Sequence, residues 1–340
     1  MKVRVVCFGE LLLRLGAPGR ERLLQRPQLD VHVGGAEANV AVSLAQLGHE
    51  AVFASVVADN ELGGAALGEL RRHGVDTSAV LRAPGRMGLY FLETGALQRP
   101  SRVLYDRSGS AFERARSDDY DWPTLLRGSA WLHLSGVTPA VGQAAADAAL
   151  AGARTARQLG VKVCFDGNFR ASLWERRQID PAPVLRQLMA EADMLLADHR
   201  DIDVVLGHEP SGAPDETERL SLAASRAFQA FPHLQTLACT RRAQRNVDHH
   251  TLSAVLVRRD GSWVETRPLE LASIVDRIGA GDAFAAGLLH ATLRGMSDPD
   301  ALGFALAAAG LKHSLPGDFN PVGEAEVLAL RDGAGFHVRR

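Results

Sequence analysis

Short apolar runs alternate with longer segments of helical periodicity along most of the chain. The apolar runs have the length of buried strands and lie at residues 3–8, 51–57, 131–135, 161–166, 194–197 and 235–240. Between them, apolar residues recur every three or four positions, which predicts helices at residues 34–47, 62–73, 143–158, 184–190, 217–230, 283–294 and 299–314. Strands that alternate with helices are typical of an α/β fold, in which helices cover both faces of a mostly parallel sheet.

Two segments interrupt this alternation. Residues 11–33 and 88–115 are polar and strand-like and contain no helical period. We interpret them as a small accessory sheet above the main sheet, a candidate lid; the alternative is a pair of surface loops. Near the C-terminal end, residues 252–257 and 262–266 predict a hairpin. No linker or repeat divides the sequence, so we expect a single domain, residues 1–340, that carries the lid.

Composition and charge narrow the range of functions. The chain has 340 residues, of which 46% are hydrophobic and 23% charged, and its net charge is −2, which gives no electrostatic reason to expect nucleic acid or a membrane surface as a partner. No apolar run is long enough to span a bilayer, and the N-terminus enters a strand without a signal-peptide core. Cys7, Cys164 and Cys239 lie in apolar segments and form no disulfide or metal pattern. We therefore expect a cytoplasmic protein.

The segment from Asp276 to Phe284 carries the most specific chemistry. A glycine-rich turn, Gly279-Ala280-Gly281, leads through Asp282 into an apolar helix. The start of a helix offers unpaired N–H groups and the positive end of the dipole, which suits a phosphoryl group in transfer. An aspartate there would repel phosphate, unless Asp282 takes the proton from an attacking hydroxyl. The alternative is a turn followed by a helix cap.

No lysine in the chain follows a glycine in the way that a phosphate-binding P-loop requires. The three lysines are Lys2, Lys162 and Lys312. Any phosphate site must therefore use backbone amides and arginine side chains.

Polar residues also follow several predicted strands, at the edge where ligands bind in doubly wound sheets. They lie at residues 34–39, 166–170, 198–201, 240–242 and 279–282.

Two other patterns resemble functional motifs but lack the residues that such motifs need. His199-Arg200-Asp201 copies a protein-kinase triplet, but Leu206 stands where the asparagine should be. His249-His250 lacks further ligands nearby and indicates an exposed turn rather than a metal site.

Residues 34–42, Gly-Gly-Ala-Glu-Ala-Asn-Val-Ala-Val, and residues 276–284 resemble the two signature motifs of the ribokinase-like (PfkB) carbohydrate kinases, in the family's order. The resemblance implies a three-layer α/β/α sandwich with a β-sheet lid. It implies that Asp282 is the catalytic base and that the amides of Gly279, Ala280 and Gly281 form an anion hole. It also implies ATP and Mg²⁺, a possible dependence on K⁺, and a homo-oligomer, a dimer or larger, formed through the lid.

Within the family, the chain is most similar to the 2-keto-3-deoxygluconate kinases, through 88–91, 105–107, 166–170 and 311–319. The resemblance implies a substrate site formed by Gly34, Gly35, Ala38, Asn39, Tyr90, Tyr105, Arg107, Arg170 and Asp282. Two arginines suit the carboxylate of a sugar acid, although an arginine-rich protein also has many surface arginines. The expected reaction is ATP-dependent phosphorylation of the primary hydroxyl. The alternatives are a kinase for a neutral sugar, such as fructose or ribose, or for a nucleoside, and a non-catalytic sugar-binding regulator.

The nucleotide side departs from the family pattern. The family's N-x-x-E motif is replaced by Asp198-His199-Arg200-Asp201, whose two carboxylates are candidate Mg²⁺ ligands. A usual glycine-rich segment is replaced by residues 240–246, which favours arginine side chains over backbone amides. We expect ATP contacts from Asn168, Asp198, Thr240, Arg241, Gly279, Gly281 and His313. The sequence does not distinguish gluconate from galactonate stereochemistry.

Overall fold

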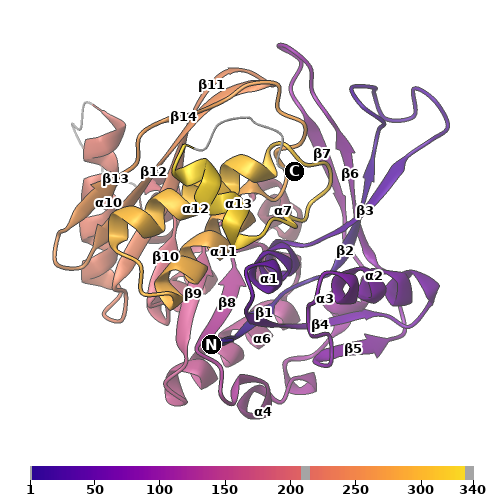
Figure 1. The fold of residues 1–340 in the computed structure, drawn as a ribbon. Coiled ribbons are helices and arrows are strands. Elements are labelled where there is room, and N and C mark those ends of the chain that lie inside the picture. Colours follow the sequence, from indigo (N-terminus) through magenta and orange to yellow (C-terminus); the bar gives the residue numbers. More distant parts are fainter. Residues whose placement is uncertain (1, 208–214, 334–340) are drawn as a thin grey trace.

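A ten-stranded, mostly parallel sheet forms the centre of the protein (Figure 1). The structure is a computed structural model and describes residues 2–207 and 215–333. The sheet has the order β13-β12-β11-β10-β9-β8-β1-β4-β5, with β14 paired to β12. Its strands are β1 (Arg4–Phe8), β4 (Glu50–Ala58), β5 (Val80–Ala83), β8 (Trp131–Ser135), β9 (Lys162–Asp166), β10 (Met194–Leu196), β11 (Thr236–Asn246), β12 (His249–Arg258), β13 (Trp263–Glu265) and β14 (Leu269–Leu271).

Helices cover the two faces of this sheet. On one face lie α1 (Ala36–Gln46), α11 (Ala280–Leu293), α12 (Asp298–Lys312) and α13 (Glu324–Arg331), which contact one another in that sequence. The other layer contains α6 (Gln143–Gln158), α8 (Ala182–Ala190), α9 (His199–Leu206) and α10 (Glu216–Ala230). The central strands are covered on both sides, which explains why β1 is a continuous apolar run whose side chains from Val5 to Phe8 have no exposed surface.

The remaining helices are short, apart from α2 (Glu61–Arg72). They are α3 (Ala111–Arg114), η1 (Ser117–Asp119), α4 (Trp122–Leu126), α5 (Val137–Val141) and α7 (Ala171–Arg177). The predicted three-layer fold is confirmed, and the hairpin of β12 with β13 forms as expected. Among the described residues, none of the helices has the length and apolar character needed to cross a bilayer.

The predicted accessory sheet is present as a separate four-stranded sheet, which we call the lid. It has the order β3-β2-β6-β7 and consists of β2 (Leu12–Gly16), β3 (Asp30–Gly34), β6 (Gly88–Glu93) and β7 (Arg102–Asp106). Arg14 pairs with Tyr90 and Tyr90 pairs with Tyr105 across its strands, so these three side chains share one face. Figure 1 shows the lid beside the end of the main sheet where α1 and α11 begin.

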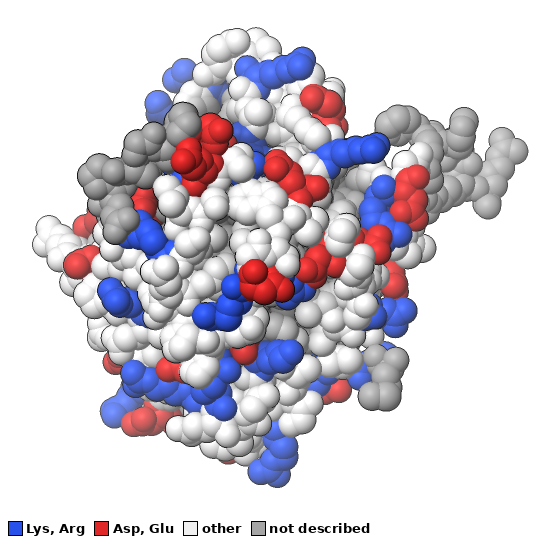
Figure 2. Space-filling model, turned by 90° about the vertical axis from the view of Figure 1, so that its left-hand side faces the viewer, with Lys and Arg blue, Asp and Glu red and all other residues white. Residues whose placement is uncertain are grey.

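One turn prediction was wrong. β11 continues six residues past the expected end at Thr240 because it forms a long hairpin with β12. His249 and His250, expected in an exposed turn, instead begin β12, and the side chain of His250 is fully buried. On the face shown in Figure 2, acidic and basic side chains are interspersed rather than gathered by sign.

Candidate active site

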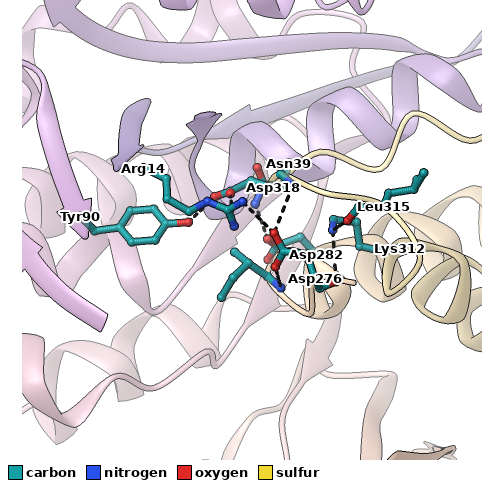
Figure 3. A network of polar contacts seen from close by, with 10 residues as sticks. Arg14, Asn39, Tyr90, Asp276, Asp282, Lys312, Leu315 and Asp318 are labelled. Atoms are coloured by element: carbon teal, nitrogen blue, oxygen red, sulfur yellow. Dashed lines mark hydrogen bonds and ion pairs between the residues drawn. The ribbon is translucent and has the colours of Figure 1, made fainter. Parts of the chain in front are cut away.

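Asp282 lies where the starts of two helices meet. It is in the first turn of α11, is only 8% exposed, and accepts a hydrogen bond of 2.6 Å from Asn39 Nδ2 of α1 (Figure 3). The other amide atom, Asn39 Oδ1, is buried and has no partner within the described residues. A buried acceptor of this kind is costly unless a ligand supplies a donor, and a sugar hydroxyl is such a donor.

The carboxyl group of Asp282 is tuned toward neutral pH. Burial raises its pKa from the usual 3.8 to about 7. The hydrogen bond from Asn39 and the charge of Arg170 oppose this rise, whereas the nearby carboxylates Glu37 and Asp318 add to it. A group with a pKa near working pH can accept a proton and release it again, which suits a general base.

The turn before Asp282 has the backbone geometry that its glycines predicted. Gly279 has a φ of 82°, and a Cβ there would lie 2.0 Å from the carbonyl oxygen of Asp318, so no other residue fits. The N–H of Ala280 donates to the carbonyl of Arg277 at 3.3 Å. The N–H groups of Gly281 and Asp282 have no partner within the described part of the chain. The sequence reasoning therefore missed one donor, the amide of Asp282 itself.

A cleft of about 550 Å³ opens beside this turn. Six predicted residues line it: Asn168, Arg170, Asp198, Asp201, Thr240 and Gly281. The structure thus brings together residues from four segments that are far apart in the sequence. A Cβ on Gly281 would meet nothing within 4 Å, so this part of the turn faces open space.

Three residues expected at the nucleotide, Gly279, Arg241 and His313, do not line the cleft. Neighbouring residues of a strand point to opposite faces, so Arg241 points away from the cleft that Thr240 lines. The guanidinium of Arg241 lies 3.0 Å from Glu265 and 5.7 Å from the centre of the Trp263 ring. His313 is buried, and its Nδ1 lies 2.7 Å from the carbonyl oxygen of Ala309 in its own helix. The alternation of β11 places Arg242, not Arg241, on the cleft face.

The two candidate metal ligands form a capping box at the start of α9. Asp198 accepts from the N–H groups of Arg200 and Asp201 at 2.8 and 3.2 Å, and Asp201 accepts from the N–H of Asp198 at 3.0 Å. Arg200 also forms an ion pair with Asp198. No cluster of three or more metal-binding side chains occurs within residues 2–207 and 215–333.

Asp166, at the end of β9, is a third carboxyl group on the cleft. The sequence placed it at the end of a predicted strand but gave it no role. Burial raises its pKa well above the usual range, and the charges of Asp282 and Asp201 add to the effect. Burial and Asp198 raise the pKa of Asp201 to about 6. A divalent cation that arrives with a nucleotide would relieve this repulsion, and Mg²⁺ prefers such oxygen ligands, so these residues fit the metal that the resemblance implies.

The predicted sugar-binding residues gather where the lid meets the main body. Tyr90 donates to Asp318 Oδ2 at 2.6 Å. Arg14 forms ion pairs with Asp276 at 2.7 Å and Asp318 at 3.0 Å (Figure 3). Tyr105 is half-buried with its ring 6.3 Å from that of Tyr90. These contacts attach the lid to both loops that flank the catalytic turn.

Around α1, the backbone is held equally closely. A Cβ on Gly34 would lie 2.1 Å from Asp318 Oδ2, and one on Gly35 would lie 2.2 Å from the carbonyl oxygen of Glu10. Ala38 is fully buried. Arg107 is also buried, and its Nε donates to Glu10 Oε2 at 2.5 Å, so part of its guanidinium is already engaged. Arg170 is exposed and makes one weak contact of 3.5 Å to the carbonyl of Phe169.

Sequence reasoning assigned no role to Arg14, Glu10 or Asp318. Glu10 could have been found, because it follows β1 at the same edge as the other strand-end residues. Arg14 gave no signal, because it is a single polar residue in a short strand whose partners lie more than 250 positions away.

Comparison with known proteins assigns the family. Residues 2–323 match the description "pfkB family carbohydrate kinase". The chain belongs to this family. The 2-dehydro-3-deoxygalactonokinase of Haloferax volcanii is 32% identical over 343 positions, with 100% of both chains covered. The 2-dehydro-3-deoxygluconokinase of Bacillus subtilis is 27% identical, covering 97% of this chain and 95% of the relative. Among solved structures, the 2-dehydro-3-deoxygluconokinase of Thermotoga maritima superposes with a TM-score of 0.91 at 38% identity, covering 97% of this chain and 100% of that one.

These findings confirm the family resemblance and the ribokinase-like fold. The protein is an enzyme that phosphorylates a sugar, which removes the non-catalytic regulator from the alternatives.

Proposed function

We propose that this enzyme transfers a phosphoryl group from ATP to the primary hydroxyl of 2-keto-3-deoxygluconate. The observation that carries the proposal is the position of Asp282, a buried carboxyl with a pKa of about 7 beside two unpaired helix amides. The names of three relatives, all kinases of 2-keto-3-deoxy sugar acids, support this substrate class.

In the proposed reaction, Asp282 takes the proton of the primary hydroxyl as its oxygen bonds to the γ-phosphorus of ATP and the bond to ADP breaks. The amides of Gly281 and Asp282, at the positive end of α11, stabilise the charge that develops on the phosphoryl oxygens. One or two of the carboxylates Asp166, Asp198 and Asp201 would hold Mg²⁺ together with phosphate oxygens of the nucleotide, because the three, all among the described residues, form no metal cluster by themselves. The metal would neutralise phosphate charge when bound. Asn39 Oδ1 would accept a hydrogen bond from the sugar and orient it.

We propose Arg170 and Arg107 as the groups that recognise the sugar carboxylate. Arg170 is supported by its exposed guanidinium at the cleft and by its influence on the pKa of Asp282. For Arg107, Glu10 fixes Nε, so the terminal nitrogens would meet the substrate in a preset orientation. This arrangement favours an acid over a neutral sugar, because a neutral sugar offers no charge to either group.

A coupled assay of ADP release tests the proposal. The panel contains 2-keto-3-deoxygluconate, its galactonate epimer, fructose, ribose and a nucleoside, each with ATP and Mg²⁺. We expect the highest kcat/KM with one of the two acids. Higher kcat/KM with a neutral sugar would contradict the proposal. The galactonate epimer is the second candidate, because the relative from Haloferax volcanii is named for it.

We also propose a homo-oligomer formed through the lid. Val31, Leu15, Phe91 and Leu104 are register partners in one row across its four strands, on the face opposite Arg14 and Tyr90. Val31 is 60% and Leu104 61% exposed, an apolar row that a second copy would cover. Light scattering on a sizing column tests this: Leu104→Glu should reduce the mass toward one chain, and a monomeric wild type would contradict the proposal.

Finally, we propose that the reaction takes place in the cytoplasm. The three cysteines are buried and unpaired, as in proteins of a reducing compartment.

A further inference from the structure

Lys312, the last residue of α12, is fully buried beneath the catalytic turn. Its ammonium donates to two backbone carbonyls, those of Leu315 at 2.9 Å and Asp276 at 3.5 Å (Figure 3). Buried lysines are rare unless they are paired, and this one is among only three in the chain. Its position therefore requires an explanation.

The side chain of Lys312 packs directly against the turn. Its Cε would lie 3.4 Å from a Cβ placed on Gly279, the residue that precedes α11. The two loops that it joins are also bonded to each other: Val275 N–H donates to the His313 carbonyl at 2.9 Å, and Gly317 N–H donates to Asp276 Oδ2 at 3.1 Å. Lys312 thus sits at the centre of the support for residues 276–279.

Two opposing influences act on the charge of this lysine, and burial is the larger of them. Burial lowers its pKa, while the carboxylates of Asp276, Asp318 and Asp282 act in the opposite direction. The ammonium has no carboxylate as a hydrogen-bond partner within the described residues, since Arg14 pairs with Asp276 and Asp318. Backbone carbonyl oxygens around a single positive charge are also the ligands that coordinate K⁺ in proteins.

We propose that Lys312 is a built-in monovalent cation that holds the catalytic turn and adds positive charge beneath its anion-binding amides. It is a positioning residue, because residues 276–279 stand between it and the reacting atoms. The family resemblance left a dependence on K⁺ open; with an ammonium tethered among these carbonyls, we expect none in this enzyme. The inference rests on the kinase function proposed above.

The first test replaces the charge and keeps the bulk. We expect Lys312→Met to lower kcat about 10- to 100-fold, with a much smaller change in KM for the sugar, because the charge acts on the transition state. Lys162→Met is the matched control: this lysine lies over the Trp131 ring at the surface, and its loss should leave kcat unchanged. Lys312→Met with wild-type kcat would overturn the inference.

The second test restores the charge from solution. Lys312→Ala leaves space beside the two carbonyls, and we expect ammonium or K⁺ to recover at least tenfold in kcat, whereas tetramethylammonium at the same ionic strength recovers nothing. The wild type should respond to none of these ions. A wild type that K⁺ activates, or an alanine variant that no ion rescues, would overturn the inference.

A third readout does not depend on activity. Relative to tetramethylammonium, ammonium or K⁺ should raise the Tm of Lys312→Ala, because an ion bound in the folded state stabilises that state. The same comparison should show no rise in the Tm of the wild type. Equal Tm responses of the two proteins would count against the inference. If the wild type releases no ADP with any sugar, the proposed function fails, and the Tm comparison still decides the role of Lys312.

Discussion

Replacing Asp282 with asparagine should stabilise the protein while it removes activity. The exchange keeps the size of the side chain, and the asparagine oxygen can still accept the hydrogen bond from Asn39. What disappears is a carboxyl group whose pKa is about 7 in the folded protein, against an ordinary value of 3.8. The folded protein therefore holds a proton on Asp282 between these two values, whereas the unfolded chain does not.

The magnitude follows from linkage. The stability contributed by a group with a raised folded pKa is complete below its unfolded pKa and is lost as pH rises through the folded pKa. For Asp282, roughly three pKa units at about 1.36 kcal/mol each correspond to about 4 kcal/mol lost above pH 7. The asparagine variant escapes this loss. Its advantage over the wild type should grow by about 2–3 kcal/mol between about pH 5 and about pH 8.

Urea unfolding at the two pH values measures this difference. An asparagine at the exposed Asp118 is the control for the exchange itself. Turnover of Asp282→Asn should fall about 10²–10⁴-fold with little change in sugar binding, and the wild-type kcat/KM should decline below about pH 7 as Asp282 becomes protonated. A pH-independent stability difference would refute the electrostatic argument, and near-normal turnover would refute the assignment of the base.

The remaining predictions concern the turn and the substrate. Gly281→Ala should abolish activity with little loss of stability, because the new Cβ would point into open space where the phosphoryl group would bind. Gly279→Ala should unfold at a lower temperature than the wild type, because its Cβ would collide with the Asp318 carbonyl. Equal Tm values for the two variants would contradict this reasoning. Arg170→Ala should raise KM for a sugar acid at least tenfold and leave KM for a neutral sugar unchanged, as measured by ADP release. A similar rise for both sugars would assign Arg170 to the nucleotide instead.

Much of the fold could be predicted because its helices and central strands carry strong local patterns. The predicted helix at 143–158 has the observed bounds of α6, and the interruptions at 11–33 and 88–115 correctly indicated the lid. The end of β11 could not be predicted from its own residues, because the polar positions after Thr240 become a strand only through pairing with β12. The short β5, at the edge of the sheet, was missed for the same reason.

The candidate site shows the same division. Residues that follow predicted strands could be expected to meet, and six of the predicted site residues line one cleft. The direction in which each side chain points could not, since a strand that continues past Thr240 sends Arg241 to one face and Arg242 to the other. The ion pairs of Arg14 were also beyond sequence reasoning, because they depend on how the lid docks against two distant loops.

The docking of Arg14 has a further consequence for the catalytic cycle. This lid arginine is the shared countercharge of Asp276 and Asp318, two carboxylates that flank the catalytic turn. Lifting the lid would separate these charges and leave both aspartates facing each other near Asp282. We therefore expect the enzyme without a sugar to favour the shut state, so that entry of substrate and release of product both require these ion pairs to separate. We expect kcat to fall as solvent viscosity rises, because lid opening contributes to the time of each turnover.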